Sequence, residues 1–353
     1  MAYSGVMSDI KACVDLRVPS RMPVFALTFE MDLGIAGLSW RHARTDIDKV
    51  VQCQLDAVRR FDHDWVMVFP DDYVEFEPLG LKMRDDENAP AMVREYLPMT
   101  HETLSRFRFP DLSSAMRIPM HLEWIRRIKQ ALGETVCVMG RVACPFSTLA
   151  LIYGIQTLLI NVIEDPELVF ENMTYFADYE VAYGRAQLDA GADGLWLGDC
   201  VAASRFISLA HYEKYTIPFA AEVASKLTSP DRFIIYHSCE TAIPYLRLQT
   251  QLPVSAVNVG ERVSMATVRR ELGITKCMTG NFDPIMLRDS TPDEIAAQTM
   301  AMIRENLAGG GYIFSTGEDT MQTTPVRNLE AMLNAARAES AAVLGRLQEA
   351  SKS

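Results

Sequence analysis

The sequence predicts a (β/α)8 barrel, and two observations carry this prediction. Eight short apolar segments recur along the 353 residues, and most of them are separated by longer stretches with helical periodicity. The segments are apolar almost throughout, which is typical of strands buried on both faces of a parallel sheet. Eight β and α units joined by right-handed crossovers favour a closed barrel over an open doubly wound sheet.

The predicted strands are short and evenly distributed. They span residues 23–29, 65–69, 135–140, 194–198, 233–237, 255–259, 276–282 and 311–316. Helix start signals lie between them. Thr291 offers an N-cap, Pro292 the first helical position and Glu294 a capping-box carboxylate. Asp165-Pro166 and Thr324-Pro325 predict two further helix starts.

Two stretches depart from the simple repeat. Residues 1–20 are expected to form a helical extension, and residues 71–134 a long insertion after the second strand, rich in charge, proline and methionine. Long insertions between a barrel strand and the helix that follows it usually build a lid or a wall of the active site. No Gly/Ser-rich or Pro-rich linker interrupts the chain, so we expect a single domain over residues 1–353.

Composition excludes several classes of protein. The chain is 49% hydrophobic and carries 34 basic against 46 acidic side chains, for a formal net charge of -12. Without clustered Lys and Arg, a nucleic-acid partner is not expected. No apolar run approaches the ~18 residues of a membrane span, and the N-terminus lacks a secretory signal. The seven irregularly spaced cysteines indicate a reducing compartment, so a cytoplasmic protein is expected.

Active sites of such barrels gather at the carboxyl ends of the strands. Asp71 and Asp199 directly close apolar runs there and are candidate catalytic or substrate-anchoring carboxylates. The alternative is helix capping, which for Asp199 is weighed evenly with catalysis. Glu240 is a further candidate, as a catalytic carboxylate or as a metal ligand, and Glu261 is another possible ligand.

The same strand ends supply candidate substrate-binding and metal-binding side chains. Glu75, Trp196, Tyr236 and Asn281 are the expected substrate-binding residues. His237 and Cys239 follow the fifth predicted strand with one residue between them, and an imidazole with a thiolate suits Zn2+. Packing of a strand-end histidine beside a buried cysteine is the alternative. A catalytic zinc needs about three protein ligands, and Glu318 after the eighth strand is the candidate third ligand unless it is an ordinary loop carboxylate.

Several segments together resemble the uroporphyrinogen decarboxylase superfamily, in order and in spacing. The resemblance covers almost the whole chain and implies the (β/α)8 barrel. The segments are FPDDYVEFEPLG (residues 69–80), CPFSTLALIYG (144–154), AGADGLWLGD (190–199), HSCE (237–240), TGNFDP (279–284) and GYIFSTGEDTMQTTPVRN (311–328).

Divergent positions indicate which branch of that superfamily the chain resembles. Its decarboxylases carry an Arg-rich segment after the first strand, where residues 29–34 are acidic and apolar, although Asp71 matches their aspartate. Its corrinoid-linked methyltransferases carry H-x-C and a later cysteine as zinc ligands. His237 and Cys239 match, and Glu318 stands at the position of the later cysteine.

The resemblance implies a zinc-dependent methyltransferase that exchanges a methyl group with a corrinoid carried by a separate protein docked over the barrel mouth. An oxygen ligand in place of a thiolate makes zinc a stronger Lewis acid, so O-demethylation of an aryl methyl ether is the favoured half-reaction. The alternatives are methyl transfer to a thiol of the coenzyme M type, a decarboxylase, and a non-catalytic binding homologue. Whether the protein forms a homodimer is left open.

Overall fold

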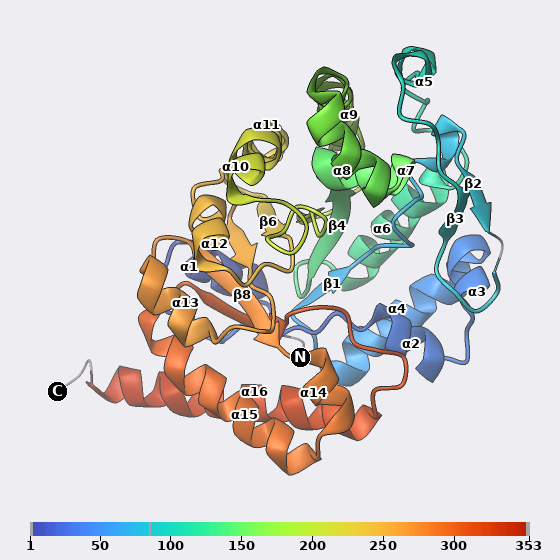
Figure 1. Ribbon diagram of the computed structural model, residues 1–353. Coiled ribbons are helices and arrows are strands. Elements are labelled where there is room, and N and C mark those ends of the chain that lie inside the picture. The colour runs from blue at the N-terminus through green and yellow to red at the C-terminus, as the bar shows by residue number, and fades with distance from the viewer. Residues whose placement is uncertain (1–2, 85, 351–353) are drawn as a thin grey trace.

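The computed structural model describes residues 3–84 and 86–350, and its centre is a curled parallel sheet of seven strands (Figure 1). The strand order is β1-β4-β5-β6-β7-β8-β9, so each strand of this sheet pairs with the next along the chain. The strands are β1 (Trp65–Met67), β4 (Cys137–Ala143), β5 (Gly194–Gly198), β6 (Phe233–His237), β7 (Ala256–Asn258), β8 (Cys277–Phe282) and β9 (Tyr312–Thr316). The predicted barrel architecture is confirmed, and β4 runs three residues beyond its predicted end.

An extended segment occupies the eighth strand position. The predicted strand over residues 23–29 is reduced to a single parallel bridge between Val24 and Phe314. The reason lies in its donors: Pro23 has no N–H, and the N–H of Val24 donates to the Asp64 carboxylate at 2.7 Å instead of to a neighbouring strand. The Val24 carbonyl accepts from the Asp64 N–H at 3.1 Å, so the segment still connects β9 with the residues before β1.

Helices surround this sheet (Figure 1). Two predicted starts are confirmed in detail, because Thr291 and Glu294 form a capping box and Asp165 accepts from the Leu168 N–H. The barrel helices and their connections are α2 (Phe29–Ile35), α3 (Trp40–Thr45), α4 (Ile47–Phe61), α7 (Pro145–Tyr153), α8 (Ile155–Glu164), α9 (Pro166–Asp189), α10 (Leu209–His211), η2 (Tyr212–Thr216), α11 (Ile217–Leu227), α12 (Ile243–Gln249), α13 (Met265–Leu272), α14 (Pro284–Asp289), α15 (Pro292–Asn306), η3 (Leu307–Gly309) and α16 (Val326–Ala350).

The two stretches outside the repeat contain their own elements. The N-terminal stretch, for which a helical extension was expected, contributes α1 (Val6–Val14). The stretch over residues 71–134 contains η1 (Glu77–Leu79), an antiparallel hairpin of β2 (Lys82–Arg84) and β3 (Met92–Glu95), α5 (His101–Arg106) and α6 (Ile118–Leu132). Its last helix, α6, packs against β4 and α4, so it covers the barrel as a repeat helix does. The part that departs from the repeat therefore ends before α6.

Large side chains fill the barrel interior below its mouth. Every second residue of a strand faces inward, and the interior cluster includes Trp65, Met139, Trp196, Ile235 and Ile313. The next inward-facing residue along each strand lies above this layer, at the carboxyl end of the strand. Among the described residues, no single helix is long and apolar enough to cross a membrane; the pair α7 and α8, bent by 115°, passes that test only when taken together.

Candidate metal centre at the barrel mouth

His237 and Cys239 lie together at the carboxyl end of β6. His237 is the last residue of the strand, and its Nε2 lies 3.4 Å from the Cys239 sulfur. Cys239 adopts a left-handed backbone conformation with φ of 54°, where the chain leaves the strand. Both sequence-predicted ligands therefore belong to one cluster.

Cys200 completes this cluster, although the sequence analysis did not select it as a ligand. Its sulfur lies 3.3 Å from that of Cys239, and the ligand atoms of Cys200, His237 and Cys239 all lie within 4.8 Å of one another. The signal that could have found it is strand register. Gly198 pairs with His237 in adjacent parallel strands, so the residues two positions beyond each are neighbours.

Glu318 also reaches the cluster, from the loop after β9. Its Oε1 lies 3.5 Å from Nε2 of His237, and this oxygen is buried without a hydrogen-bond partner. Burial favours the neutral acid, but the neighbouring imidazole of His237 leaves the pKa of Glu318 below its usual value. An unsatisfied, ionised carboxylate oxygen beside two thiols and an imidazole is chemically suited to a cation.

Three of the six separations among these four groups can be compared with those of a tetrahedral zinc site; the ligand atoms that all lie within 4.8 Å of one another are those of Cys200, His237 and Cys239, without Glu318. With Zn–S bonds of ~2.3 Å and Zn–N or Zn–O bonds of ~2.1 Å, adjacent ligands lie ~3.8 Å apart for two sulfurs, ~3.6 Å for S and N, and ~3.4 Å for N and O. The corresponding separations here are 3.3, 3.4 and 3.5 Å. Each lies within ~0.5 Å of its tetrahedral edge. Two sulfurs, one imidazole nitrogen and one carboxylate oxygen form a normal zinc donor set.

Asn258 orients the histidine from the opposite side. Its Oδ1 lies 2.8 Å from Nδ1 of His237, so the second ring nitrogen donates to it and Nε2 is left free for a metal. The Asn258 amide in turn donates to Thr279 Oγ1 at 3.2 Å. The sequence analysis also missed Asn258. Register could have found it, because Asn258 pairs with His237 across β6 and β7.

The two aromatic candidates lie on opposite sides of the barrel wall. Trp196 faces inward, with its ring centroid 4.8 Å from that of His237, and forms the floor beneath the imidazole. Tyr236 faces the helix layer, is fully buried, and donates its hydroxyl to Asp199 at 2.8 Å. The expected substrate-binding position of Tyr236 is therefore corrected: it follows from strand alternation that Tyr236 and His237 cannot both face the mouth.

Asp199 is a buried capping residue. Its carboxylate accepts from the Ser147 N–H in the first turn of α7 at 3.1 Å as well as from Tyr236. Burial raises the pKa of Asp199 to about 6. Catalysis and helix capping were weighed evenly for Asp199. This geometry matches capping of α7, the helix that follows β4.

Glu240 organises loops and does not face the metal cluster. It is buried, and its two carboxylate oxygens accept from the backbone and hydroxyl of Ser204 and from the N–H groups of Thr241 and Ala242, at 2.7 to 2.8 Å. These bonds fix the loop after β5 to the loop after β6. Since Cys200 lies on the first loop and Cys239 on the second, Glu240 helps hold the two thiols together.

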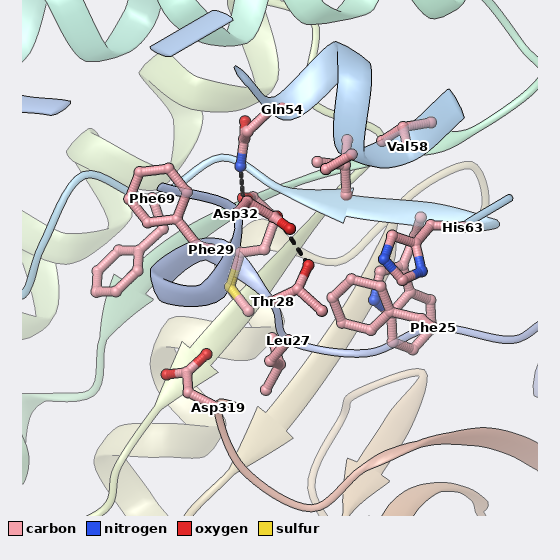
Figure 2. A pocket seen from close by; sticks show the side chains of 14 residues that line it. Phe25, Leu27, Thr28, Phe29, Asp32, Gln54, Val58, His63, Phe69 and Asp319 are labelled. Carbon is pink, nitrogen blue, oxygen red and sulfur yellow. Dashed lines mark hydrogen bonds between the residues drawn. The ribbon is translucent and has the colours of Figure 1, made fainter. Parts of the chain in front are cut away.

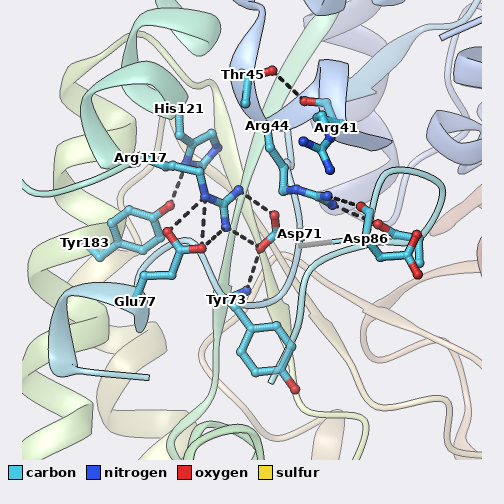
Figure 3. A network of polar contacts seen from close by, with 11 residues as sticks. Arg41, Arg44, Thr45, Asp71, Tyr73, Glu77, Asp86, Arg117, His121 and Tyr183 are labelled. Carbon is cyan, nitrogen blue, oxygen red and sulfur yellow. Dashed lines mark hydrogen bonds and ion pairs between the residues drawn. The ribbon is translucent and has the colours of Figure 1, made fainter. Parts of the chain in front are cut away.

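Asp71 lies in a buried ion-pair network beside the barrel (Figure 3). Arg117 donates to both of its oxygens, at 2.6 and 3.1 Å, and also forms a two-point contact with Glu77. The Tyr73 N–H donates to Asp71 at 2.9 Å. The Asp71 side chain is almost fully buried and shares the charge of Arg117 with Glu77, a geometry that matches a structural role.

Glu75 belongs to a second buried cluster, with Arg141 and Glu180. Its Oε1 lies 3.8 Å from Nη1 of Arg141, and burial raises the pKa of Glu75 to about 8. Burial and the charge of Glu75 also raise the pKa of Glu180. The last expected substrate-binding residue, Asn281, donates to the carbonyls of Gly260 and Val263 and so fixes the loop after β7.

A pocket adjoins the mouth where residues 23–29 meet β1 (Figure 2). Thr28 donates to Asp32 at 2.8 Å, and burial raises the pKa of Asp32 to about 7. Asp319, next to Glu318, lines the same pocket. The pocket is small, with a volume of about 30 Å³, so it is not a substrate cavity by itself.

The fold is a parallel barrel, and the site at its mouth groups strand-end thiols and an imidazole that could hold a metal ion. Residues 11–339 match the uroporphyrinogen decarboxylase (URO-D) family model, and the chain belongs to that family.

Several relatives match most of the chain. The chain is 24% identical to a methylcobamide:CoM methyltransferase MtbA of Methanosarcina mazei over 86% of this chain and 88% of the relative. It is 24% identical to a methylated-thiol–coenzyme M methyltransferase of the same organism, covering 91% and 84%. It is 26% identical to a uroporphyrinogen decarboxylase of Crocosphaera subtropica, covering 85% and 84%. A solved methyltransferase structure from Methanosarcina mazei superposes with a TM-score of 0.85 at 20% identity, covering 94% and 98%.

Proposed function

We propose that this protein is a zinc-dependent, corrinoid-linked methyltransferase that transfers a methyl group from a methylated corrinoid protein to a small thiol. The observation that carries the proposal is the cluster of Cys200, His237 and Cys239 at the barrel mouth. The two relatives named as coenzyme M methyltransferases support this class of reaction.

Cys200 changes the balance between the two candidate half-reactions. Preference for an aryl methyl ether rested on a zinc with one thiolate and the harder Glu318 oxygen. A second sulfur in the donor set makes the metal softer and better matched to a thiol. Of the two aromatic residues expected to bind substrate, Trp196 and Tyr236, the second is fully buried against Asp199. O-demethylation stays a prediction, and the assay below tests it alongside thiol methylation.

Zinc bound at this site would lower the pKa of a thiol acceptor and so supply a thiolate nucleophile. Cys200, His237 and Cys239 would hold the metal, with Glu318 as the oxygen ligand. Asn258 fixes the ring of His237, and Trp196 closes the barrel beneath it and excludes water from below. A methylated corrinoid on the partner protein would supply the methyl group that this thiolate accepts.

The corrinoid would be carried by a partner protein. Within the described residues, every strand belongs either to the barrel sheet or to the β2–β3 hairpin, which leaves no second sheet for a cobalamin-binding domain. A partner has to approach the open end of the barrel, where the metal cluster lies. The seven free cysteines suit a reducing compartment, and we place the protein in the cytoplasm.

Decarboxylation of a porphyrinogen is less well supported. Asp71, which matches the decarboxylase aspartate, is buried and shares the charge of Arg117 with Glu77, and residues 29–34 carry no basic side chain.

Cobalamin absorbance tests the function directly. Zinc-loaded protein is incubated with methylcobalamin and a panel of thiols, and separately with Co(I) corrinoid and a panel of methoxyarenes. Loss of methyl-Co(III) with a thiol supports the proposal. Formation of methyl-Co(III) from a methoxyarene, without thiol activity, supports O-demethylation instead. Unchanged spectra in both arms, together with less than about a tenth of an equivalent of bound zinc, indicate a non-catalytic binding homologue.

A further inference from the structure

Cys200 and Cys239 are the two cysteines that a small reagent can reach. All seven cysteines lie in the described part of the chain, and five of them are buried, whereas Cys200 and Cys239 are partly exposed at the barrel mouth. Their sulfurs are 3.3 Å apart, in direct contact. An S–S bond between them needs a further approach of only about 1 Å. The mouth therefore presents an accessible dithiol.

The local backbone keeps this pair together and still leaves it room to move. Each cysteine lies two residues beyond the end of its strand, β5 for Cys200 and β6 for Cys239, so neither belongs to a strand. Glu240 ties the two loops, because it accepts from Ser204 and from the two backbone N–H groups that directly follow Glu240. This tie contains no candidate metal ligand, so the two thiols stay neighbours with or without zinc.

Zinc binding and disulfide formation exclude each other at this pair. A cysteine binds a metal as its thiolate, and a disulfide has no thiolate to offer. A Cys200–Cys239 disulfide leaves only His237 and Glu318 of the four candidate ligands, and a catalytic zinc needs about three protein ligands. Oxidation of the pair therefore releases the metal, and bound zinc in turn shields both sulfurs.

We propose that Cys200 and Cys239 form a reversible disulfide that releases zinc when the small thiol used as methyl acceptor is oxidised to its own disulfide. The choice of oxidant rests on the proposed thiol methylation: a mouth that admits a small thiol also admits the disulfide made from two such thiols. The protein then stops when its acceptor is mainly oxidised. The reduced thiol restores the pair by the reverse exchange.

The exchange takes place in two steps. The thiolate of one cysteine attacks a sulfur of the small disulfide, which forms a mixed disulfide and expels one small thiolate. The second cysteine attacks the mixed disulfide, forms the Cys200–Cys239 bond and expels the other small thiolate. Two electrons pass from the cysteine pair to the small disulfide, and the two cysteine protons end on the two released thiols.

Thiol counting on the metal-free protein tests the pair without relying on turnover. Reduced protein is incubated without oxygen with 2-hydroxyethyl disulfide, then denatured and alkylated with N-ethylmaleimide. We expect the alkylated cysteines to fall from seven to five, and peptide mapping to find Cys200 joined to Cys239. Excess 2-mercaptoethanol should restore all seven. Seven alkylated cysteines after treatment, a bond between other cysteines, or two separate mixed disulfides would overturn the proposal.

Zinc-loaded protein tests the link to the metal. The same treatment should release one zinc ion for each disulfide formed, measured after desalting. Disulfide formation should be at least about tenfold slower than in the metal-free protein, since bound zinc limits access to the sulfurs. Zinc that stays bound after the disulfide has formed would overturn the release step.

Single variants show which cysteines take part. In Cys200→Ser and in Cys239→Ser the exchange should stop at the mixed disulfide, so each variant gains the mass of one small thiol and forms no bond within the chain. Cys53→Ala removes a buried thiol of α4 and is the matched control, which should still form the Cys200–Cys239 bond. An intrachain disulfide in either serine variant would overturn the assignment.

The failures of this proposal and of the proposed function are distinguishable. A protein that binds zinc and methylates a thiol, but forms no disulfide, loses the redox proposal alone. A reduced protein that binds no zinc loses the proposed function and the release step with it. Because thiol counting uses the unaltered protein, the test holds even if a serine variant fails to fold.

Discussion

The sulfurs of Cys200 and Cys239 lie 3.3 Å apart, although the two residues are 39 positions apart in sequence. This proximity follows from the register of β5 and β6, in which Gly198 pairs with His237 and each cysteine follows two residues later. The thiol pair is thus fixed by the sheet itself, and Glu240 then ties the two loops that carry it.

Replacing Cys200 by serine should weaken zinc binding. The change removes one sulfur donor and leaves His237, Cys239 and Glu318, so we expect a loss of about 100-fold or more in metal affinity, beyond the 10- to 100-fold typical of outer-shell changes. Competition with a chromophoric chelator measures it. Cys53→Ala, which removes a thiol in α4, is the control, and equal zinc affinity in both variants would exclude Cys200 as a ligand.

Replacing Asn258 by alanine should weaken the metal without removing a ligand. Loss of the acceptor for His237 Nδ1 is expected to cost about 10- to 100-fold in zinc affinity. Asn258→Asp retains an acceptor and should bind zinc more tightly than the alanine variant. The same chelator competition decides, and an alanine variant with unchanged affinity would show that the ring is held by packing on Trp196 alone.

Replacing Arg117 by methionine should destabilise the fold. It would leave Asp71 and Glu77 buried without a counter-charge, which typically costs about 3 to 5 kcal/mol. Urea unfolding measures the change. Arg126→Met, which removes an exposed pair with Glu123, should cost less than about 1 kcal/mol. If Arg117→Met is as stable as wild type but inactive, Asp71 serves catalysis and not structure.

Glu75 should make stability fall as the pH rises. Its pKa in the folded protein is about 8, above the ordinary value of 4.5, so between these values the folded state binds more protons than the unfolded state. The free energy of unfolding should then decrease by up to ~1.4 kcal/mol per pH unit from about pH 5 to about pH 8.

Glu75→Gln removes this titration and should flatten the profile. Urea unfolding at a series of pH values compares the two proteins. Parallel profiles would mean that Glu75 stays ionised through its contact with Arg141.

The barrel could be predicted from sequence because its signal is repeated. Seven of the eight apolar runs form parallel strands of one sheet, and only the first, over residues 23–29, failed to form a regular strand. There Pro23 lacks a donor and Asp64 captures the N–H of Val24. Such a side-chain interaction over 40 residues has no local signature in the sequence.

The site was only partly predictable, for a related reason. His237, Cys239 and Glu318 were found from residue type and position at strand ends, and they do lie together. Cys200 and Asn258 depended on the register between strands, which residue type alone does not specify. Asp199, Glu240 and Tyr236 were selected for their chemistry, but burial and hydrogen bonding commit them to holding loops and helices.

X-ray absorption at the zinc edge tests the central claim most directly, because it counts the sulfur atoms around the metal. We predict two sulfur neighbours at ~2.3 Å in the zinc-loaded protein, from Cys200 and Cys239, and a third when the thiol acceptor is added. A protein that retains less than about a tenth of an equivalent of zinc, or a sulfur count that stays the same with a saturating thiol, would contradict the account.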